Sequence, residues 1–191
     1  EILNKPHNPS GTILRDAKLL QLEEILRPTD TLVLSDEVYE HLVFDGASHQ
    51  SVSKYPGLKE RSFVCASFGK TFHITGWKMG YCMAPKVLMD EFRKIHEFVV
   101  FSVNHPAQRA LVQYMQKPSR YEGLSHFFQQ KRDLFLEGLR DSRFEFTPAE
   151  GTYFQLLNFS KISPLGDLEF AQELLLEKGV AGIPISVFNL N

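Results

Sequence analysis

The sequence predicts an α/β fold, in which helices cover a mainly parallel sheet, followed by part of a smaller α+β unit. Apolar runs and helical patterns alternate through the first part of the chain, and this alternation is typical of parallel sheets. The run 31–34 is apolar at neighbouring positions, as a strand buried under helices on both faces requires. After Ser142 the pattern changes to short alternating runs with one helix, which indicates the α+β unit.

Length and composition are those of a globular protein. The 191 residues are 43% hydrophobic, which is enough to bury a sizeable core. The net charge is −2 without a basic block, so nucleic acid and anionic membranes are poor partners. No apolar stretch approaches the length of a membrane span. Cys65 and Cys82 lie in apolar runs without metal-ligand spacing, so we expect buried thiols, no metal site and a cytoplasmic location.

Apolar spacing, proline and glycine predict the elements of the first part. Residues 1–4 form a short strand, and two prolines and a glycine make a turn that displays Asn8 at the strand end. Leucines at helical spacing predict a helix over residues 12–26, which a following proline ends. Residues 31–34 form the next strand.

Two apolar runs frame a glycine-containing stretch in the middle of the chain. Residues 61–67 and 79–84 are predicted strands. The polar segment 41–55 before them is expected to be a surface or entrance loop. Two helices are expected after them, over residues 87–98 and 106–115.

The last part is expected to contain one long helix and then a mixed unit. Residues 121–139 carry leucines and phenylalanines at helical spacing. Alternating patterns predict short strands over 144–146 and 151–157. A helix is predicted over 168–178 and a final strand over 180–185.

Lys70 is the candidate for nucleophilic chemistry. It lies between two apolar strands, where a lysine loses hydration and its neutral amine, which can form a Schiff base, is favoured. Asp36 lies at the carboxyl end of the strand 31–34, where open α/β sheets bind ligands. Tyr39 follows three residues later, so one helical turn would put its hydroxyl on the same side as Asp36.

Three motifs together resemble one enzyme family. Residues 67–80 are similar to the lysine segment of fold-type-I pyridoxal-phosphate (PLP) aminotransferases, and residues 8–11 and 35–39 resemble two further motifs of class I/II members. Their order is the family's, which makes the set more specific than any single motif. The resemblance extends over nearly the whole chain and is strongest to the branch that acts on methionine, aromatic amino acids and kynurenine.

The resemblance implies the PLP-dependent transferase fold of type I, with helices on both faces of the sheet. Residues 1–119 would be part of the large PLP-binding domain. Residues 120–191 would form the interdomain helix and part of the small C-terminal domain. The family's cofactor-stacking aromatic residue and its substrate-binding arginine have no counterpart in this sequence, so we expect a fragment that lacks the first part and the C-terminal end.

The resemblance also implies roles for individual residues. Lys70 would hold PLP and act as general base, and Asp36 would face the ring nitrogen and keep it protonated. Asn8 and Tyr39 would bind the phenolic oxygen of the cofactor. Ser67 would offer its hydroxyl to the phosphate.

Lys78 departs from the family's pattern, which usually has a phosphate-binding arginine at this position. The charge is kept, but the bidentate geometry of arginine is not. Ordinary structural roles also explain several of these residues: a turn for Asn8, a helix cap or ion pair for Asp36, and a solvated charge for Lys78. Residues 150–153 resemble a family turn near the substrate entrance, and a hairpin corner explains them equally well.

The implied activity is transfer of an amino group from an amino acid to a 2-oxo acid, through PLP and pyridoxamine phosphate, with ping-pong kinetics. The donor would be methionine, an aromatic or a similar apolar amino acid. A homodimer is expected. Two alternatives stay open, namely a PLP-dependent carbon–sulfur β-lyase that acts on cysteine conjugates and a non-catalytic aminotransferase-like module.

Two unrelated families fit the lysine segment poorly. A nucleotide-binding P-loop needs glycine five residues before Gly69, where this chain has Val64. A serine–lysine acyl transferase with Ser67 as nucleophile needs Ser-Asp-Asn and Lys-Thr-Gly elements after it. The similar stretches of this chain precede Ser67 or share Lys70, so they cannot supply these elements.

Overall fold

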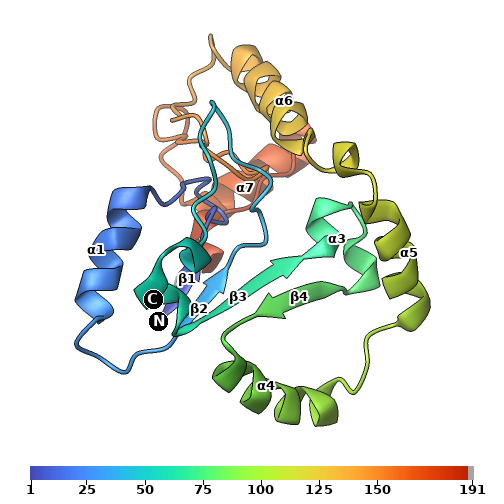
Figure 1. The fold of residues 1–191 in the computed structure, drawn as a ribbon. Helices are drawn as coiled ribbons and strands as arrows, with labels where there is room; N and C mark the ends of the chain where they lie inside the picture. The colour runs from blue at the N-terminus through green and yellow to red at the C-terminus, as the bar shows by residue number, and fades with distance from the viewer. Residues whose placement is uncertain (189–191) are drawn as a thin grey trace.

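A four-stranded mixed sheet is the centre of the fold (Figure 1). In the computed structural model, which describes residues 1–188, the strand order is β1-β2-β3-β4. The first three strands run parallel, and β4 runs antiparallel to β3. Their bounds are Ile2–Asn4 (β1), Val33–Asp36 (β2), Ser62–Ser67 (β3) and Gly80–Met83 (β4). The prediction of an α/β fold with a mainly parallel sheet is confirmed.

One row of residues crosses the sheet near the carboxyl ends of the parallel strands. The register pairs Asn4 with Asp36, Asp36 with Cys65, and Cys65 with Cys82. Paired residues of neighbouring strands point to the same face of a sheet, so these four side chains share one face. We call them the cross-sheet row.

The main apolar core lies between the sheet and helix α1 (Asp16–Leu26). Val33 of β2 and Val64 of β3 are buried there against Leu19 of α1. Two short helices complete this layer: η1 (Val52–Lys54) and α2 (Pro56–Lys59). Burial of an aliphatic side chain contributes about 1.5–3 kcal/mol, so this layer holds the strands that carry the site.

The opposite face of the sheet is covered only in part by the described residues. Phe63 contacts Phe92 of helix α4 (Lys86–Val99), with ring centroids 6.2 Å apart. Leu34 is 40% exposed, whereas its neighbour Val33 is fully buried. The expected strand 31–34, buried on both faces, is therefore wrong in its bounds and its burial, because Val33 and Leu34 point to opposite faces and only one face is packed.

The helices of the first part lie close to their predicted positions. Helix α4 and helix α5 (His105–Met115) match the predictions over 87–98 and 106–115. Helix α1 begins four residues later than predicted, because Arg15, the residue before it, is in an extended conformation.

The segment 41–55 is more deeply packed than the expected surface loop. Leu42, Val43 and Phe44 are at most 5% exposed, and Val43 forms an isolated bridge with Gly151. Three consecutive apolar residues give this segment surface to bury, and residues 149–152 cover it. The prediction was wrong because it gave weight to the polar residues further along the segment.

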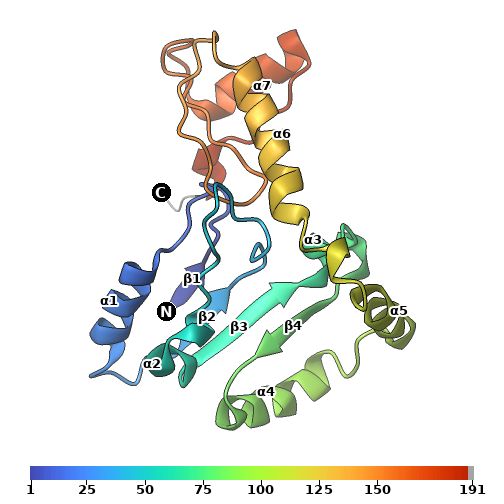
Figure 2. The same ribbon diagram turned by 45° about the horizontal axis from the view of Figure 1, so that its top comes forward.

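The second part of the chain contains helices but no strand within residues 120–188. Helix α6 (Leu124–Gly138) is shorter than the helix predicted over 121–139. Helix α7 (Asp167–Lys178) matches the helix predicted over 168–178. Figure 2 shows both beyond the end of the sheet toward which β3 points. The remaining short helices are η3 (Pro118–Arg120) and η4 (Ile185–Phe188).

The strands predicted over 144–146, 151–157 and 180–185 are therefore wrong. Only isolated bridges form, between Glu145 and Asn158 and between Gly151 and Val43. A strand needs a continuous ladder of hydrogen bonds to a neighbour, and the described residues provide single pairs instead. None of the helices within residues 1–188 is long and apolar enough to cross a lipid bilayer.

Candidate active site

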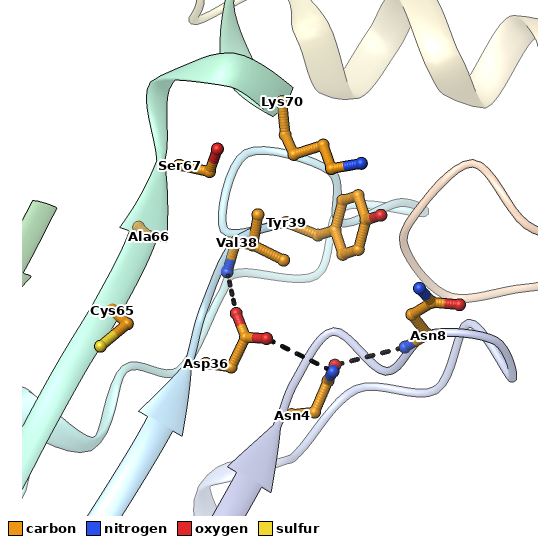
Figure 3. A pocket seen from close by; sticks show the side chains of 9 residues that line it. All are labelled: Asn4, Asn8, Asp36, Val38, Tyr39, Cys65, Ala66, Ser67 and Lys70. Atoms are coloured by element: carbon orange, nitrogen blue, oxygen red, sulfur yellow. Dashed lines mark hydrogen bonds between the residues drawn. The ribbon is translucent and has the colours of Figure 1, made fainter. Parts of the chain in front are cut away.

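A cavity of about 370 Å³ opens at the carboxyl ends of β1, β2 and β3 (Figure 3). It is lined by residues from three stretches of the chain that are distant in sequence. The lining residues are Asn4, Asn8, Asp36, Val38, Tyr39, Cys65, Ala66, Ser67 and Lys70. Five of the six predicted site residues are thus in one place: Asn8, Asp36, Tyr39, Ser67 and Lys70.

Asp36 is the last residue of β2 and is held by two neighbours. One carboxylate oxygen accepts a hydrogen bond from the backbone N–H of Val38 at 3.1 Å. The other lies 3.5 Å from the side-chain amide nitrogen of Asn4, its partner in the cross-sheet row. Asn4 in turn accepts a bond from the backbone N–H of Asn8 at 3.3 Å, so it joins the Asn8 turn to the carboxylate (Figure 3).

Tyr39 lies in a turn after β2, where the sequence predicted a helical turn. Its side chain still lines the same cavity as Asp36, as expected. Its hydroxyl donates a hydrogen bond to the Tyr153 hydroxyl at 3.2 Å. Burial first, then this bond and the nearby charge of Asp36, raise the pKa of Tyr39, so the hydroxyl stays protonated at neutral pH.

Lys70 lies on the short helix α3 (Phe68–Thr71), directly after β3. Its side chain extends over the Tyr39 ring in Figure 3. The amine nitrogen donates a hydrogen bond to the Tyr153 hydroxyl oxygen at 3.2 Å. Lys70 is only partly buried, so the apolar enclosure expected from the two flanking strands is incomplete in the described chain.

Close backbone packing sets the position of α3 relative to the sheet. A Cβ atom on Gly80 would lie 2.5 Å from the carbonyl oxygen of Ala66, so only glycine fits at the start of β4. The backbone N–H of Gly69 donates to the carbonyl oxygen of Met79 at 3.3 Å. These contacts place Ser67 and Lys70 at the cavity wall.

Asn8 is presented by a turn that the chain packs tightly. Gly11 has a φ of 68°, and a Cβ atom there would lie 2.5 Å from the Cβ atom of Ala149. The N–H of Gly11 donates to the carbonyl oxygen of His7 at 2.8 Å. The turn predicted from the prolines and glycine is therefore present, and Asn8 lines the cavity.

Lys78 is exposed and is not among the cavity-lining residues. It follows the short helix η2 (Thr75–Trp77) in a left-handed conformation with φ 54°. Its assignment to phosphate binding stays a prediction.

Five residues at the site were not predicted from the sequence: Asn4, Val38, Cys65, Ala66 and Tyr153. The strand pairing that brings Asn4 and Cys65 to Asp36 depends on register. The contact of Tyr153 with Lys70 spans 83 residues. The resemblance of residues 150–153 to a turn near the substrate entrance was the one available signal.

Cys65 and Cys82 are free thiols, each partly buried. Burial first, and then the neighbouring Cys82 thiol, raise the pKa of Cys65 to about 12. A thiol with this pKa stays protonated and is a poor nucleophile, so Cys65 contributes shape and not reactivity to the cavity.

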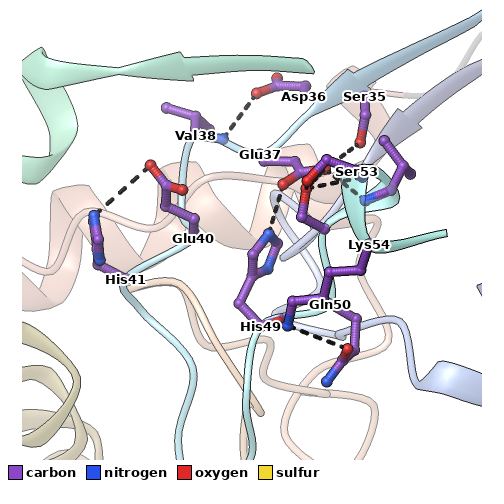
Figure 4. Close-up of polar contacts among 12 residues, drawn as sticks. Ser35, Asp36, Glu37, Val38, Glu40, His41, His49, Gln50, Ser53 and Lys54 are labelled. Atoms are coloured by element: carbon purple, nitrogen blue, oxygen red, sulfur yellow. Dashed lines mark hydrogen bonds and ion pairs between the residues drawn. The ribbon is translucent and has the colours of Figure 1, made fainter. Parts of the chain in front are cut away.

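A second polar cluster lies behind the cavity (Figure 4). Glu37 follows Asp36 but points away from the cavity and is 2% exposed. Its carboxylate binds the His49 Nε2 atom at 2.7 Å and accepts bonds from the Ser35 hydroxyl at 2.9 Å and the Val52 N–H at 3.1 Å. Burial raises the pKa of Glu37, but the bonds to His49, Ser51 and Ser35 outweigh it, so the net pKa is lowered.

Known proteins match this chain over nearly all of its length. Residues 2–191 match the family model described as aminotransferase class I and II. The chain is 48% identical over 188 residues to methionine aminotransferase of Escherichia coli, covering 98% of this chain and 49% of that protein. It is 34% identical to kynurenine–oxoglutarate transaminase of Dictyostelium discoideum, covering 98% of this chain and 48% of that protein.

Solved structures agree with these relatives. The crystal structure of an E. coli protein with a methionine aminotransferase function has a TM-score of 0.97 at 48% identity, covering all of this chain and 50% of that one. N-succinyldiaminopimelate aminotransferase of Mycobacterium tuberculosis has a TM-score of 0.94 at 32% identity, also covering 100% of this chain and 50% of that one. This chain spans about half the length of the curated relatives. The chain belongs to the class I and II aminotransferase family.

Proposed function

We propose that the protein carrying this chain is a PLP-dependent aminotransferase that moves the amino group of an amino acid to a 2-oxo acid. One observation carries the proposal. Asn8, Asp36, Tyr39, Ser67 and Lys70 come from separate motifs of the sequence and line one cavity at the carboxyl end of the sheet. The similarity to methionine and kynurenine aminotransferases supports it.

The donor set of the cavity fits PLP. A carboxylate, Asp36, lies at one end and an amine, Lys70, at the other, with the Tyr39 hydroxyl between them. PLP needs an acid partner for its ring nitrogen, donors for its phenolic oxygen, and an amine for its aldehyde. We assign these roles to Asp36, to Asn8 with Tyr39, and to Lys70, and phosphate binding to Ser67 and Lys78.

The residues of this chain would act as a proton-handling set. When bound, PLP withdraws electrons from the Cα atom of the substrate and so weakens its C–H bond. Asp36, held by Asn4 and the Val38 N–H, would face the ring nitrogen and stabilise positive charge there. Lys70 Nζ is placed to take the proton from Cα and return it as general base and acid.

We also propose the wider setting of this site. The donor would be methionine or an aromatic amino acid, since relatives named for methionine and kynurenine match the chain. Residues 1–119 would belong to the large domain and residues 120–191 to an interdomain helix and the small domain. The complete protein would be a cytoplasmic homodimer.

The test uses the full-length protein with added PLP. Visible absorbance of the bound cofactor should change when methionine is added, with the matching 2-oxo acid appearing. Varying both substrates should give parallel double-reciprocal lines, the sign of ping-pong kinetics. Release of pyruvate from a cysteine conjugate without amino transfer would favour the carbon–sulfur lyase, and cofactor binding without any product would favour the non-catalytic module.

A further inference from the structure

Tyr153 joins the two groups of the site that handle protons. Its hydroxyl oxygen accepts a hydrogen bond from the Lys70 amine and another from the Tyr39 hydroxyl, each at 3.2 Å. Both bonds end on this one oxygen, and the Tyr153 O–H can still donate to a further partner. Lys70 and Tyr39 are thereby linked through one atom that belongs to neither of their motifs.

The backbone before Tyr153 is fastened to the loops that carry the site. The N–H groups of Glu150 and Gly151 both donate to the carbonyl oxygen of Gly11, each at 2.9 Å. The N–H of Thr152 donates to the carbonyl oxygen of Leu42 at 2.9 Å. Gly11 belongs to the Asn8 turn and Leu42 follows the Tyr39 turn, so residues 150–152 are wedged between two of the three site motifs.

Glycine at position 151 is required for this fit. A Cβ atom there would lie 2.6 Å from the carbonyl oxygen of Leu42 and 3.0 Å from the Cβ atom of Pro6. Thr152 is fully buried and takes a φ of 66°, which a threonine adopts only when its surroundings enforce it. The conformation that aims Tyr153 at Lys70 is therefore imposed by packing.

Aromatic packing fixes the orientation of the Tyr153 ring as well. The ring meets that of Tyr39 edge-on, with centroids 5.2 Å apart. Phe128 of α6 lies 5.8 Å away and Phe154 lies 4.8 Å away between centroids. Tyr153 is 43% exposed, but the contacts with three neighbouring rings restrict the orientation of its ring and hydroxyl.

We propose that Tyr153 is a positioning residue for Lys70, whose hydroxyl holds the amine beside Tyr39 whenever the amine is not bonded to the cofactor. This inference rests on the proposed function, because such a role is needed only if Lys70 is released and recaptured during turnover. It adds a residue from the second part of the chain to a site otherwise built from residues 4–70.

The hydrogen bond to Tyr153 also restrains the Lys70 amine. The amine must give up this bond before its nitrogen can attack a reagent. The other titratable groups that line the cavity with Lys70 are Tyr39, Cys65 and Asp36. The first two stay protonated at neutral pH because their pKa values are raised, so neither gives the amine an anionic partner. Removing the Tyr153 hydroxyl should therefore make Lys70 more reactive as a nucleophile at neutral pH.

The decisive experiment measures Lys70 in the cofactor-free, full-length protein. Trace labelling with acetic anhydride across neutral to alkaline pH, read by mass spectrometry of the Lys70 peptide, reports how readily the amine reacts. In Tyr153→Phe, which keeps the ring, labelling at neutral pH should rise about threefold to tenfold, because the amine no longer has to break this bond. Tyr114→Phe is the matched control, since that ring packs on Arg120.

A second variant tests the packing of residues 150–152 between the Asn8 and Tyr39 turns and keeps the Tyr153 hydroxyl. Gly151→Ala should displace Tyr153 and shift Lys70 labelling in the same direction, provided its circular dichroism matches that of the parent protein. A Tyr153→Phe profile identical to that of the parent protein would overturn the proposal, because a purely packing role leaves the profile unchanged.

Amino transfer measured in the same preparations separates this inference from the proposed function. A labelling shift in a protein that transfers no amino group would defeat the proposed function and leave the contact standing. Normal amino transfer without a labelling shift would defeat the positioning role. With both correct, Tyr153→Phe lowers kcat and leaves KM for the amino donor nearly unchanged.

Discussion

Lys70 carries the proposed chemistry, and its surroundings at the residue scale are polar as well as apolar. Its amine points into a cavity bounded by Asp36, Tyr39 and Ser67 and is held by Tyr153. The amine is therefore placed by hydrogen bonding more than by burial. Its reactivity should depend on the groups around it and not on the lysine alone.

Replacement of Lys70 by alanine should remove both the covalent attachment of the cofactor and the general base. We expect turnover to fall by at least about 10²–10⁴-fold, the range for loss of a general acid–base group. The visible absorbance of the protein with added PLP should fall to that of free cofactor. Lys59→Ala, on an exposed position of α2, is the control and should behave as the parent protein. Substantial turnover in Lys70→Ala would remove Lys70 from the mechanism.

The site residues that occur in sequence motifs could be predicted. Those that reach the site only through strand pairing or tertiary contacts could not. Asp36 and Lys70 follow apolar strands, so their place at the strand ends is a local property of the chain. Asn4 becomes a partner of Asp36 only through the β1–β2 register, and no local pattern fixes that register. In the sequence, Tyr153 follows helix α6 and an irregular segment. The path of that segment depends on tertiary contacts.

At the scale of elements, the β3–β4 pair is the support of the lysine segment. The two strands approach so closely at Gly80 that the Ala66 carbonyl oxygen occupies the space of a side chain. Helix α3, which carries Lys70, begins two residues after Ala66. A change in strand separation would therefore move the amine directly.

Gly80→Ala should strain this pair. A Cβ atom 2.5 Å from a backbone oxygen forces the strands apart, and we expect a loss of about 1–3 kcal/mol in the free energy of unfolding. Urea unfolding measures it. Gly76→Ala is the matched control in the same segment, because nothing lies within 4 Å of its Cβ position. Equal stability of the two variants would contradict the tight β3–β4 contact.

Glu37 and its hydrogen-bond partners make the stability of the turn after β2 depend on pH. The pKa of Glu37 is lowered below its ordinary value of 4.5, so the folded state binds a proton less readily than the unfolded state. This contribution to stability is present above pH 4.5 and is lost as the pH falls through the lower, folded-state pKa. Acid should therefore loosen the turn that carries Asp36 and Tyr39.

Glu37→Gln isolates this effect. At neutral pH we expect the variant to be less stable by about 1–3 kcal/mol, because a buried charged acceptor is lost to His49. The difference from the parent protein should shrink below pH 4.5, as seen by urea unfolding at a series of pH values. Exposed Glu60→Gln serves as control. A difference that stays constant through acid pH would refute the linkage.

Strong periodicity made helices predictable, and its absence made the later strands unpredictable. Helices α4 and α5 carry regular apolar spacing, and both lie within one residue of the expected bounds. Residues 144–146 and 151–157 alternate as a strand would, yet they find only single bridging partners. Alternation shows that a segment has one apolar side, but a strand also needs a neighbour with free hydrogen-bonding groups.

At the scale of the whole molecule, Arg132 connects helix α6 to the site. Its guanidinium binds both carboxylate oxygens of Asp45 at 2.7 Å and the carbonyl oxygen of Ala149 at 2.7 Å. The Arg132 side chain is 9% exposed. Ala149 begins the segment that leads to Tyr153, so this one side chain links α6, the segment 41–55 and the approach to Lys70.

Arg132→Met should loosen this connection while keeping most of the apolar stem. We expect a loss of about 1–2 kcal/mol in stability, since the Ala149 carbonyl oxygen loses its partner and Asp45 is open to water. Turnover should also fall. Arg140→Met is the matched control, because its ion pair with Glu137 is exposed and such pairs contribute little. Thermal unfolding and activity of both variants would decide, and equal behaviour would rule out the connection.

The cross-sheet row makes the surroundings of Asp36 adjustable from a distance. Asn4, Asp36, Cys65 and Cys82 lie side by side on neighbouring strands. Asn4 and Cys65 are therefore adjacent to the Asp36 carboxylate, and Cys82 is separated from it by Cys65. A substitution at Asn4 or Cys65 would alter the field at Asp36 directly, whereas one at Cys82 would act through Cys65. An engineer therefore has a graded series of positions with which to tune this site, with large effects expected beside the carboxylate and small ones at the far strand.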